Sequence, residues 1–218
     1  MSTLHFNQIG RINKDINGKY CIEAIPGIGG PFSLAADYYR AWATYQRENP
    51  RAAGLSEFPN CVSRAAEFLS SKPSGPFTLS HPDFGYHNFL VDDDYNLLAV
   101  VDWDEAFVGP IEFSAVFPMS LSTLHPSMWQ GSSFDTEERH QEEAVLAVQQ
   151  AQYRRVMDTQ AERTKATPVK DSLSLQVLIA QGINRYPQGD LNPWEWLVGF
   201  LERDMETVTN GAVNHTGA

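Results

Sequence analysis

The order of apolar and polar residues predicts a β-hairpin in the first part of the chain. Two extended runs, at residues 4–12 and 19–25, flank Asn17-Gly18, a pair that favours the positive φ angles of a tight turn. Residues 26–31 then bring three glycines close together. Their spacing fits no phosphate-binding motif, and Pro31 lacks the amide that such a loop needs, so we interpret this segment as a structural turn.

Apolar residues at three- and four-residue spacing predict two helices after this turn. The first extends from a Ser33 cap to Glu48. The second extends from about Asn60 to Ser71, where a run rich in proline and glycine stops it.

Short apolar runs predict strands in the central part, and helical spacing returns after them. The strands are expected at residues 77–80, 89–91 and 97–101. The later helices are expected at residues 112–121, 136–165, 172–185 and 193–207. Residues 210–218 show no pattern and are expected to form a flexible tail, which leaves residues 1–209 as one domain.

The net charge of the chain limits which kinds of molecule it is expected to bind. The 218 residues include 16 Lys and Arg against 27 Asp and Glu, a formal net charge of −11. Because non-specific binding to nucleic acid or to anionic lipid rests on clustered positive charge, we expect neither nucleic acid nor a membrane as a partner. The length is enough for one domain with its own core.

The cysteine content and the absence of long apolar runs indicate a cytoplasmic protein. Cys21 and Cys61 are too few for a disulfide framework and lack the paired spacing of a zinc site. Residues 1–6 show no basic and apolar pattern of a secretory signal, and no apolar run is long enough to cross a bilayer. We expect two reduced thiols and a cytoplasmic location.

One group of polar residues in the central part of the chain contains the residue types that a catalytic site uses. His81 and Asp83 lie at the start of a loop, and Asn88 follows in the same loop. Asp102 directly follows the apolar run at residues 97–101. Phosphoryl transfer needs one carboxylate to orient or deprotonate the accepting hydroxyl and two oxygen ligands to hold Mg²⁺ against a triphosphate. Asp83, Asn88 and Asp102 have the order and loop spacing in which protein kinases place these groups.

The expected hairpin brings two of these residues together. If the two strands within residues 89–101 pair antiparallel, a register that sets Val91 against Ala99 also sets Asn88 against Asp102, because paired residue numbers keep a constant sum. Two oxygen ligands would then meet at the open end of the hairpin. The acidic turn between the strands lies at the opposite end, and we interpret it as solvated rather than as a metal site.

This segment resembles the catalytic segment of the aminoglycoside phosphotransferase and choline kinase-like family, in which a His-x-Asp-x-x-x-x-Asn loop precedes an apolar strand ending in Asp-Trp. Those positions are here His81, Asp83, Asn88, Asp102 and Trp103. The resemblance implies that Asp83 is the catalytic base or the carboxylate that orients the hydroxyl. It also implies that Asn88 and Asp102 hold the Mg²⁺ of Mg·ATP, and that His81 and Trp103 support the loop. It also implies an α+β, mainly helical fold, the C-terminal lobe of the protein kinase-like fold, with the catalytic loop on short β-hairpins.

Three further polar residues near the loop are candidates for contact with a substrate. His87 immediately precedes Asn88, and Asp104 and Glu105 follow Trp103. Capping a helix or bonding to neighbouring side chains is the alternative role of the two acids. A cationic acceptor, such as an aminoglycoside or a choline-like amine, would suit the acidic balance of the chain, although net charge bears first on solubility.

The resemblance covers one lobe, from about residue 7 to residue 201, and is to fungal-type members. A kinase of this kind also needs a lobe with a Gly-rich loop and a strand lysine that contacts the phosphates. Lys14 and Lys19 are the only lysines before Lys72, and they flank the Asn17-Gly18 turn. We therefore expect the N-terminal nucleotide lobe to be absent from these residues, so that ATP binding would depend on a lobe supplied elsewhere.

Two functions are compatible with these residues. The first is Mg²⁺-dependent transfer of the ATP γ-phosphate to a small-molecule hydroxyl, by a fragment of a longer kinase or together with a chain that supplies the other lobe. The alternative is a truncated or pseudo-phosphotransferase whose site is silent or repurposed, for small-molecule binding or for acid–base isomerisation or cyclisation.

Overall fold

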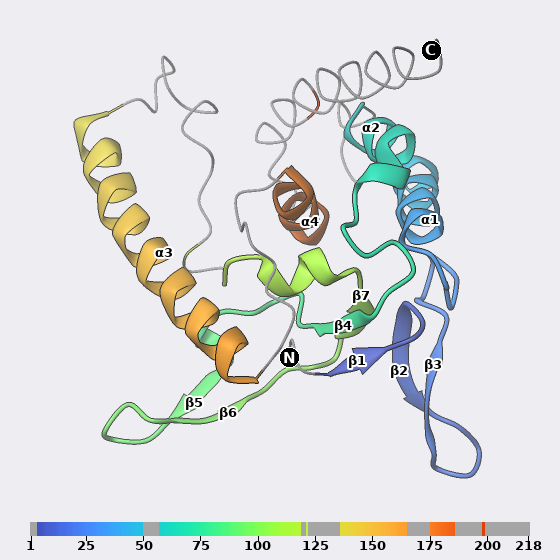
Figure 1. Ribbon diagram of the computed structural model, residues 1–218, viewed down its shortest axis with the longest axis horizontal. Coiled ribbons are helices and arrows are strands. Elements are labelled where there is room, and N and C mark those ends of the chain that lie inside the picture. The colour runs from blue at the N-terminus through green and yellow to red at the C-terminus, as the bar shows by residue number, and fades with distance from the viewer. Residues whose placement is uncertain are drawn as a thin grey trace.

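The computed structural model describes residues 4–49, 57–118, 121, 136–164, 175–185 and 198, and it combines helices with two antiparallel sheets (Figure 1). The larger sheet has the order β1-β4-β7-β2-β3, with strands His5–Phe6 (β1), Gly10–Lys14 (β2), Tyr20–Glu23 (β3), Phe77–Ser80 (β4) and Phe107–Gly109 (β7). Phe89–Val91 (β5) and Leu97–Val100 (β6) pair separately. The expected mixture of helices and strands is confirmed, and the assignment to a C-terminal lobe alone stays a prediction.

The predicted hairpin is present between β2 and β3. Its last ladder pair joins Lys14 to Tyr20, and Gly18 adopts a φ of 75° in the turn. The single extended run expected at residues 4–12 is divided, because Ile9 forms a bridge to Phe32 while β1 pairs with β4. As a result, β1 pairs with β4 at one edge of the sheet, whereas β2 lies between β7 and β3.

Two helices follow the hairpin close to where the spacing predicts them: Ala35–Glu48 (α1) and Glu57–Ala65 (α2), the latter continued by a 3-10 turn, Ala66–Phe68. The expected Ser33 cap is wrong, because Leu34 occupies the N-cap position and no side chain caps the helix. α2 begins before Asn60, since its buried face already includes Phe58. Pro59 does not prevent this, because a helix tolerates proline in its first turn.

The core lies between the larger sheet and the helices α1, α2 and Leu175–Arg185 (α4). Figure 1 shows the three helices on the same side of this sheet. Tyr38 of α1 stacks on Phe107 of β7 and meets Phe113 edge to face, each with 6.0 Å between ring centroids. These ring contacts attach α1 to the segment that follows the candidate catalytic hairpin.

The segment after that hairpin differs from the sequence prediction. β7 was not expected, and the predicted helix at residues 112–121 is reduced to a 3-10 turn, Ile111–Ala115. Pro118 gives a physical reason, because a proline disfavours helical backbone at the residue before it, and Val116 is already extended. The buried Glu112 carboxylate accepts hydrogen bonds from Ser70 and Ser71, which joins this turn to the end of the α2 region.

The remaining described helices agree with the sequence. Glu137–Thr164 (α3) and α4 fall within the helices expected at residues 136–165 and 172–185. The helix expected at residues 193–207 lies, apart from Val198, outside the described residues, as does the tail at residues 210–218. Within the described parts of the chain, no helix is both long and apolar enough to cross a membrane.

Candidate active site

The loop that carries the motif connects β4 to β5. It runs from His81 through Gly85 and ends in a 3-10 turn, Tyr86–Asn88, directly before β5. His81 and Asn88, at its two ends, are 4% and 5% exposed, whereas the Asp83 side chain between them is 43% exposed. The loop is therefore anchored at both ends and presents its carboxylate to solvent.

Asn88 holds the loop in shape. Its side-chain amide donates to the main-chain oxygen of Asp83 at 2.8 Å and to Asp83 Oδ2 at 3.1 Å. Its main-chain amide donates to the oxygen of Gly85 at 3.0 Å. One buried amide thus fixes both the backbone and the carboxylate of Asp83.

His87 contacts the same carboxylate. Its Nε2 lies 2.9 Å from Asp83 Oδ2. The His87 hydrogen bond is the largest cause that lowers the pKa of Asp83 below its ordinary value; partial burial opposes it, and Asn88 adds to it. Asp83 is therefore ionised at neutral pH. The contact that the structure gives His87 is to Asp83, and the predicted contact with substrate stays a prediction.

His81 and Trp103 brace the loop against the hairpin. Because a carbonyl only accepts, His81 Nε2 is the donor to the main-chain oxygen of Val101, at 2.9 Å. The indole of Trp103 donates to the oxygen of Val100 at 2.8 Å, and its ring lies edge to face with His81 at 4.8 Å. Both side chains tie β4 to the end of β6. The supporting role that the resemblance implies for them stays a prediction.

The register expected for the catalytic hairpin is wrong by one residue. β5 and β6 pair Leu90 with Ala99, and the amide of Val101, not Asp102, bonds to the main-chain oxygen of Asn88 at 2.9 Å. The pairing shifts after Leu90, so paired residue numbers do not keep a constant sum across the hairpin. Asp102 follows directly, with an exposed side chain and a positive φ of 60°.

The oxygen donors of the loop and hairpin suit a magnesium ion. The Asn88 amide forms its hydrogen bonds through its nitrogen. Within the described structure, the Asn88 side-chain oxygen and the Asp102 carboxylate take part in no hydrogen bond or ion pair. Mg²⁺ prefers one or two such protein oxygens together with substrate phosphates. No group of three or more His, Cys, Asp or Glu side chains among the described residues could hold a metal.

The described residues do not fit the rest of a nucleotide. Lys14 lies on the β2–β3 hairpin with its Nζ 5.0 Å from the ring centre of Tyr20, and Lys19 adjoins the same turn. Lys72, the other lysine of the described parts, is exposed in the loop before β4. None of the three follows a Gly-rich loop on a strand, so this part of the chain contains no counterpart of the phosphate-binding lysine.

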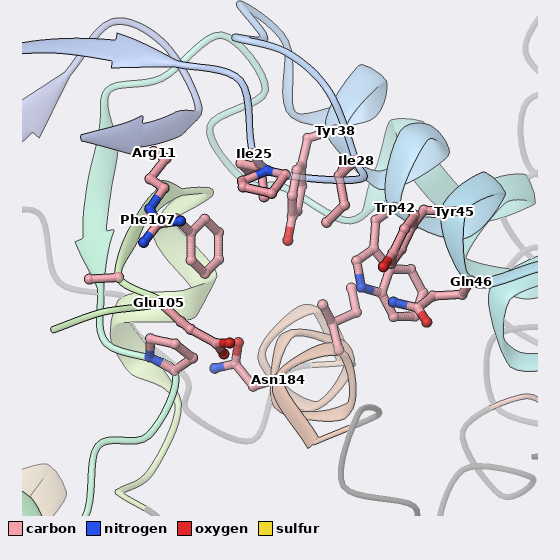
Figure 2. Close-up of a pocket in the computed structure, with 14 residues that line it drawn as sticks. Arg11, Ile25, Ile28, Tyr38, Trp42, Tyr45, Gln46, Glu105, Phe107 and Asn184 are labelled. Carbon is pink, nitrogen blue, oxygen red and sulfur yellow. The ribbon is translucent and has the colours of Figure 1, made fainter. Parts of the chain in front are cut away.

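A cavity of about 300 Å³ adjoins the catalytic loop (Figure 2). Pro82, directly before Asp83, and Glu105 belong to its wall. Asp104 is not part of the wall, but its main-chain oxygen accepts a hydrogen bond from Arg11. Of the candidate substrate contacts, only Glu105 thus reaches this cavity.

Sequence reasoning missed most of the cavity wall. Arg11, Tyr38, Gln46 and Asn184 come from β2, α1 and α4. Gln46 gave the one usable signal, because it is a polar residue on the apolar face of α1 and is buried. The other three show nothing unusual in sequence and meet only when the sheet and helices pack.

The order of these residues indicates a class of protein. Protein kinases place a catalytic Asp and a metal-binding Asn in one loop and a metal-binding Asp further along the chain, and Asp83, Asn88 and Asp102 have this order. Residues 24–116 match the sequence model of the phosphotransferase enzyme family. The resemblance drawn from the motif is therefore confirmed for this segment, which is similar to that family. Comparisons with the curated proteins and with the solved structures find no match.

Proposed function

We propose that the chain provides the metal-binding and hydroxyl-orienting part of a Mg²⁺-dependent phosphotransferase that acts on a small-molecule hydroxyl. The observation that carries this proposal is the pair of hydrogen bonds from the Asn88 amide to Asp83. They hold a carboxylate in a fixed position while leaving the asparagine oxygen for a cation. The match of residues 24–116 to the phosphotransferase enzyme family, whose members generally use ATP and Mg²⁺, supports the same reaction.

Asp83 would act on the acceptor. Its Oδ2 is occupied by Asn88 and His87, so Oδ1 is the oxygen left to accept a hydrogen bond from the hydroxyl. The acceptor oxygen forms a bond to phosphorus while the bond to the nucleoside diphosphate breaks, and the hydroxyl proton passes to Asp83. A carboxylate with a lowered pKa is a weak base, so orientation of the hydroxyl is the larger part of its role.

Asn88 and Asp102 would hold the metal, which when bound supplies positive charge to the transferred phosphate. The lysine and Gly-rich loop that complete such a site would come from another lobe, in the same polypeptide or in a partner chain. The net charge of −11 agrees with this division, because an acidic lobe needs cations from elsewhere to hold a triphosphate.

The test is ATP turnover with Mg²⁺ across a panel of amino alcohols, hydroxy amino acids and sugars. Asp83→Asn keeps the size of the side chain but removes the charge and replaces one acceptor oxygen with an NH2 group, and we expect turnover to fall about 100-fold or more. Glu67→Gln, an exposed carboxyl paired with Arg40 on the α1 side, is the matched control and should keep full turnover. Turnover that is no higher in the wild type than in Asp83→Asn would contradict the proposal.

A silent or repurposed site is the second candidate, and the position of Lys14 over Tyr20 favours it. Thermal-shift titration separates the two. A site that keeps only its metal ligands should be stabilised by Mg²⁺ no more in the presence of ATP than without it. Stabilisation by Mg·ATP that disappears in Asn88→Ala would count against the second candidate.

A further inference from the structure

The wall of the cavity beside the loop combines apolar and polar surface in similar amounts. The apolar part is formed mainly by Ile25, Ile28, Tyr38, Trp42, Phe107 and Ile183. Among its polar side chains, Arg11 and Glu105 carry opposite charges. We propose that this cavity binds a zwitterionic hydroxy amino acid with an apolar side chain, and that this compound is the phosphate acceptor.

The two charges exclude simpler ligands. A volume of about 300 Å³ is at the lower end for small-molecule sites, so one ligand that fills the cavity meets both Arg11 and Glu105. An amine alone would face the Arg11 guanidinium, and a carboxylate alone would face Glu105. A zwitterion places an opposite charge against each.

The positions of these side chains fit the two ends of an amino acid. Figure 2 shows Glu105 and Asn184 directed toward each other, and Arg11 separately beside the Phe107 ring. Arg11 donates to the main-chain oxygen of Asp104, which holds its guanidinium at the wall and leaves further N–H groups for a carboxylate. The Glu105 carboxylate and the Asn184 amide oxygen suit an ammonium group.

The apolar wall accounts for the side chain of the ligand. The rings of Tyr38, Trp42 and Phe107 come from α1 and β7 and offer flat faces to an aromatic or branched aliphatic group. Pro82 lies in the same wall directly before Asp83, so a bound ligand is next to the loop that would orient its hydroxyl. The role as acceptor rests on the proposed function, whereas the binding does not.

Three compounds with the same phenyl ring and hydroxyl test the charges separately. Phenylserine carries both an ammonium and a carboxylate, 2-amino-1-phenylethanol lacks the carboxylate, and 3-hydroxy-3-phenylpropanoate lacks the ammonium. Isothermal titration calorimetry of the full chain, without ATP or Mg²⁺, should give phenylserine an affinity about tenfold higher than that of either analogue. Equal affinities, or no binding of phenylserine, would overturn the proposal.

Variants of Arg11 and Glu105 show which charge of the ligand each side chain recognises. Arg11→Gln should remove the advantage of phenylserine over the amine, and Arg11→Lys should restore part of it. Glu105→Gln should remove the advantage over the hydroxy acid. Glu48→Gln, which makes the same charge change in the last turn of α1 outside the cavity wall, should leave all three affinities unchanged. Unchanged preferences in Arg11→Gln and Glu105→Gln would place the binding elsewhere and overturn the proposal.

The failure of this proposal and the failure of the proposed function give different results. If the chain transfers phosphate to other acceptors but shows no preference for phenylserine, only the proposal about the acceptor class is refuted. If the chain prefers phenylserine in the titration but transfers no phosphate to it, the proposed binding site stands and the proposed reaction is refuted.

Discussion

Replacement of Asn88 by alanine tests whether one buried amide holds the catalytic loop. The change removes two donors, the bond to the main-chain oxygen of Asp83 at 2.8 Å and the bond to its carboxylate at 3.1 Å. The main-chain bond from Asn88 to Gly85 remains available. The expected loss is therefore that of the side chain alone.

The size of the loss follows from the two bonds. A hydrogen bond between neutral groups contributes about 1 kcal/mol to the free energy of unfolding. The bond to the carboxylate would contribute more if buried, but Asp83 is 43% exposed, so screening by solvent reduces it to about 1 kcal/mol. The sum is about 2 kcal/mol, which lowers the melting temperature of a domain of this size by about 4–8 °C.

Urea denaturation and thermal melting of the wild type and Asn88→Ala measure this loss. Asn96→Ala is the matched control, because its amide also donates to a carboxylate, Asp92 Oδ2 at 2.9 Å, but in the exposed turn between β5 and β6. We expect the control to lose about 0.5 kcal/mol or less. Magnesium titration of the same proteins should show weaker binding in Asn88→Ala only.

The reasoning fails if Asn88→Ala and Asn96→Ala unfold at the same urea concentration. In that case backbone packing would determine the shape of the loop, and the Asn88 side chain would not stabilise the position of Asp83. Asn88→Asp gives an additional check, since it removes both donors and puts a second carboxylate beside Asp83. It should be at least as unstable as Asn88→Ala at neutral pH and should recover as the pH falls.

Three further predictions concern stability. Glu112→Ala should lower the free energy of unfolding by about 3 kcal/mol in urea titrations, because it removes a buried carboxylate that accepts three hydrogen bonds from Ser70 and Ser71; a loss below 1 kcal/mol would contradict this. Gly27→Ala should cost more than Gly18→Ala, about 3 against about 1 kcal/mol, since both have positive φ but only at Gly27 would a Cβ lie 2.5 Å from a tyrosine ring of α1. Equal melting temperatures of the two variants would refute the steric argument. The lowered pKa of Asp83 means that its hydrogen bonds stabilise the fold above the unfolded-state pKa of about 3.9 and lose that effect as the pH falls through the folded-state pKa. The stability difference between wild type and Asp83→Asn should therefore be constant from neutral pH to about pH 5 and shrink below pH 4; a difference that stays constant down to pH 3 would contradict it.

Local patterns were sufficient for much of the architecture. The Asn17-Gly18 pair predicts the β2–β3 turn because few residues adopt its backbone angles, and apolar spacing predicts α1 because a helix repeats every 3.6 residues. The motif from His81 to Asn88 predicts the catalytic loop because its contacts lie within a few residues of one another. These features depend on neighbours in sequence.

Contacts between distant segments decided what local patterns could not. The pairing that sets Val101 against Asn88 depends on a register shift in β5, and the short strand β7 exists because β2 and β4 flank it. The cavity is the clearest case, since Arg11, Glu105 and Asn184 are remote in the chain. The sequence by itself determined the similarity to the phosphotransferase enzyme family and the position of the loop from His81 to Asn88. Only the packing of α1 and α4 against the sheet determined which side chains surround a ligand, because burial and charge pairing act through space rather than along the chain.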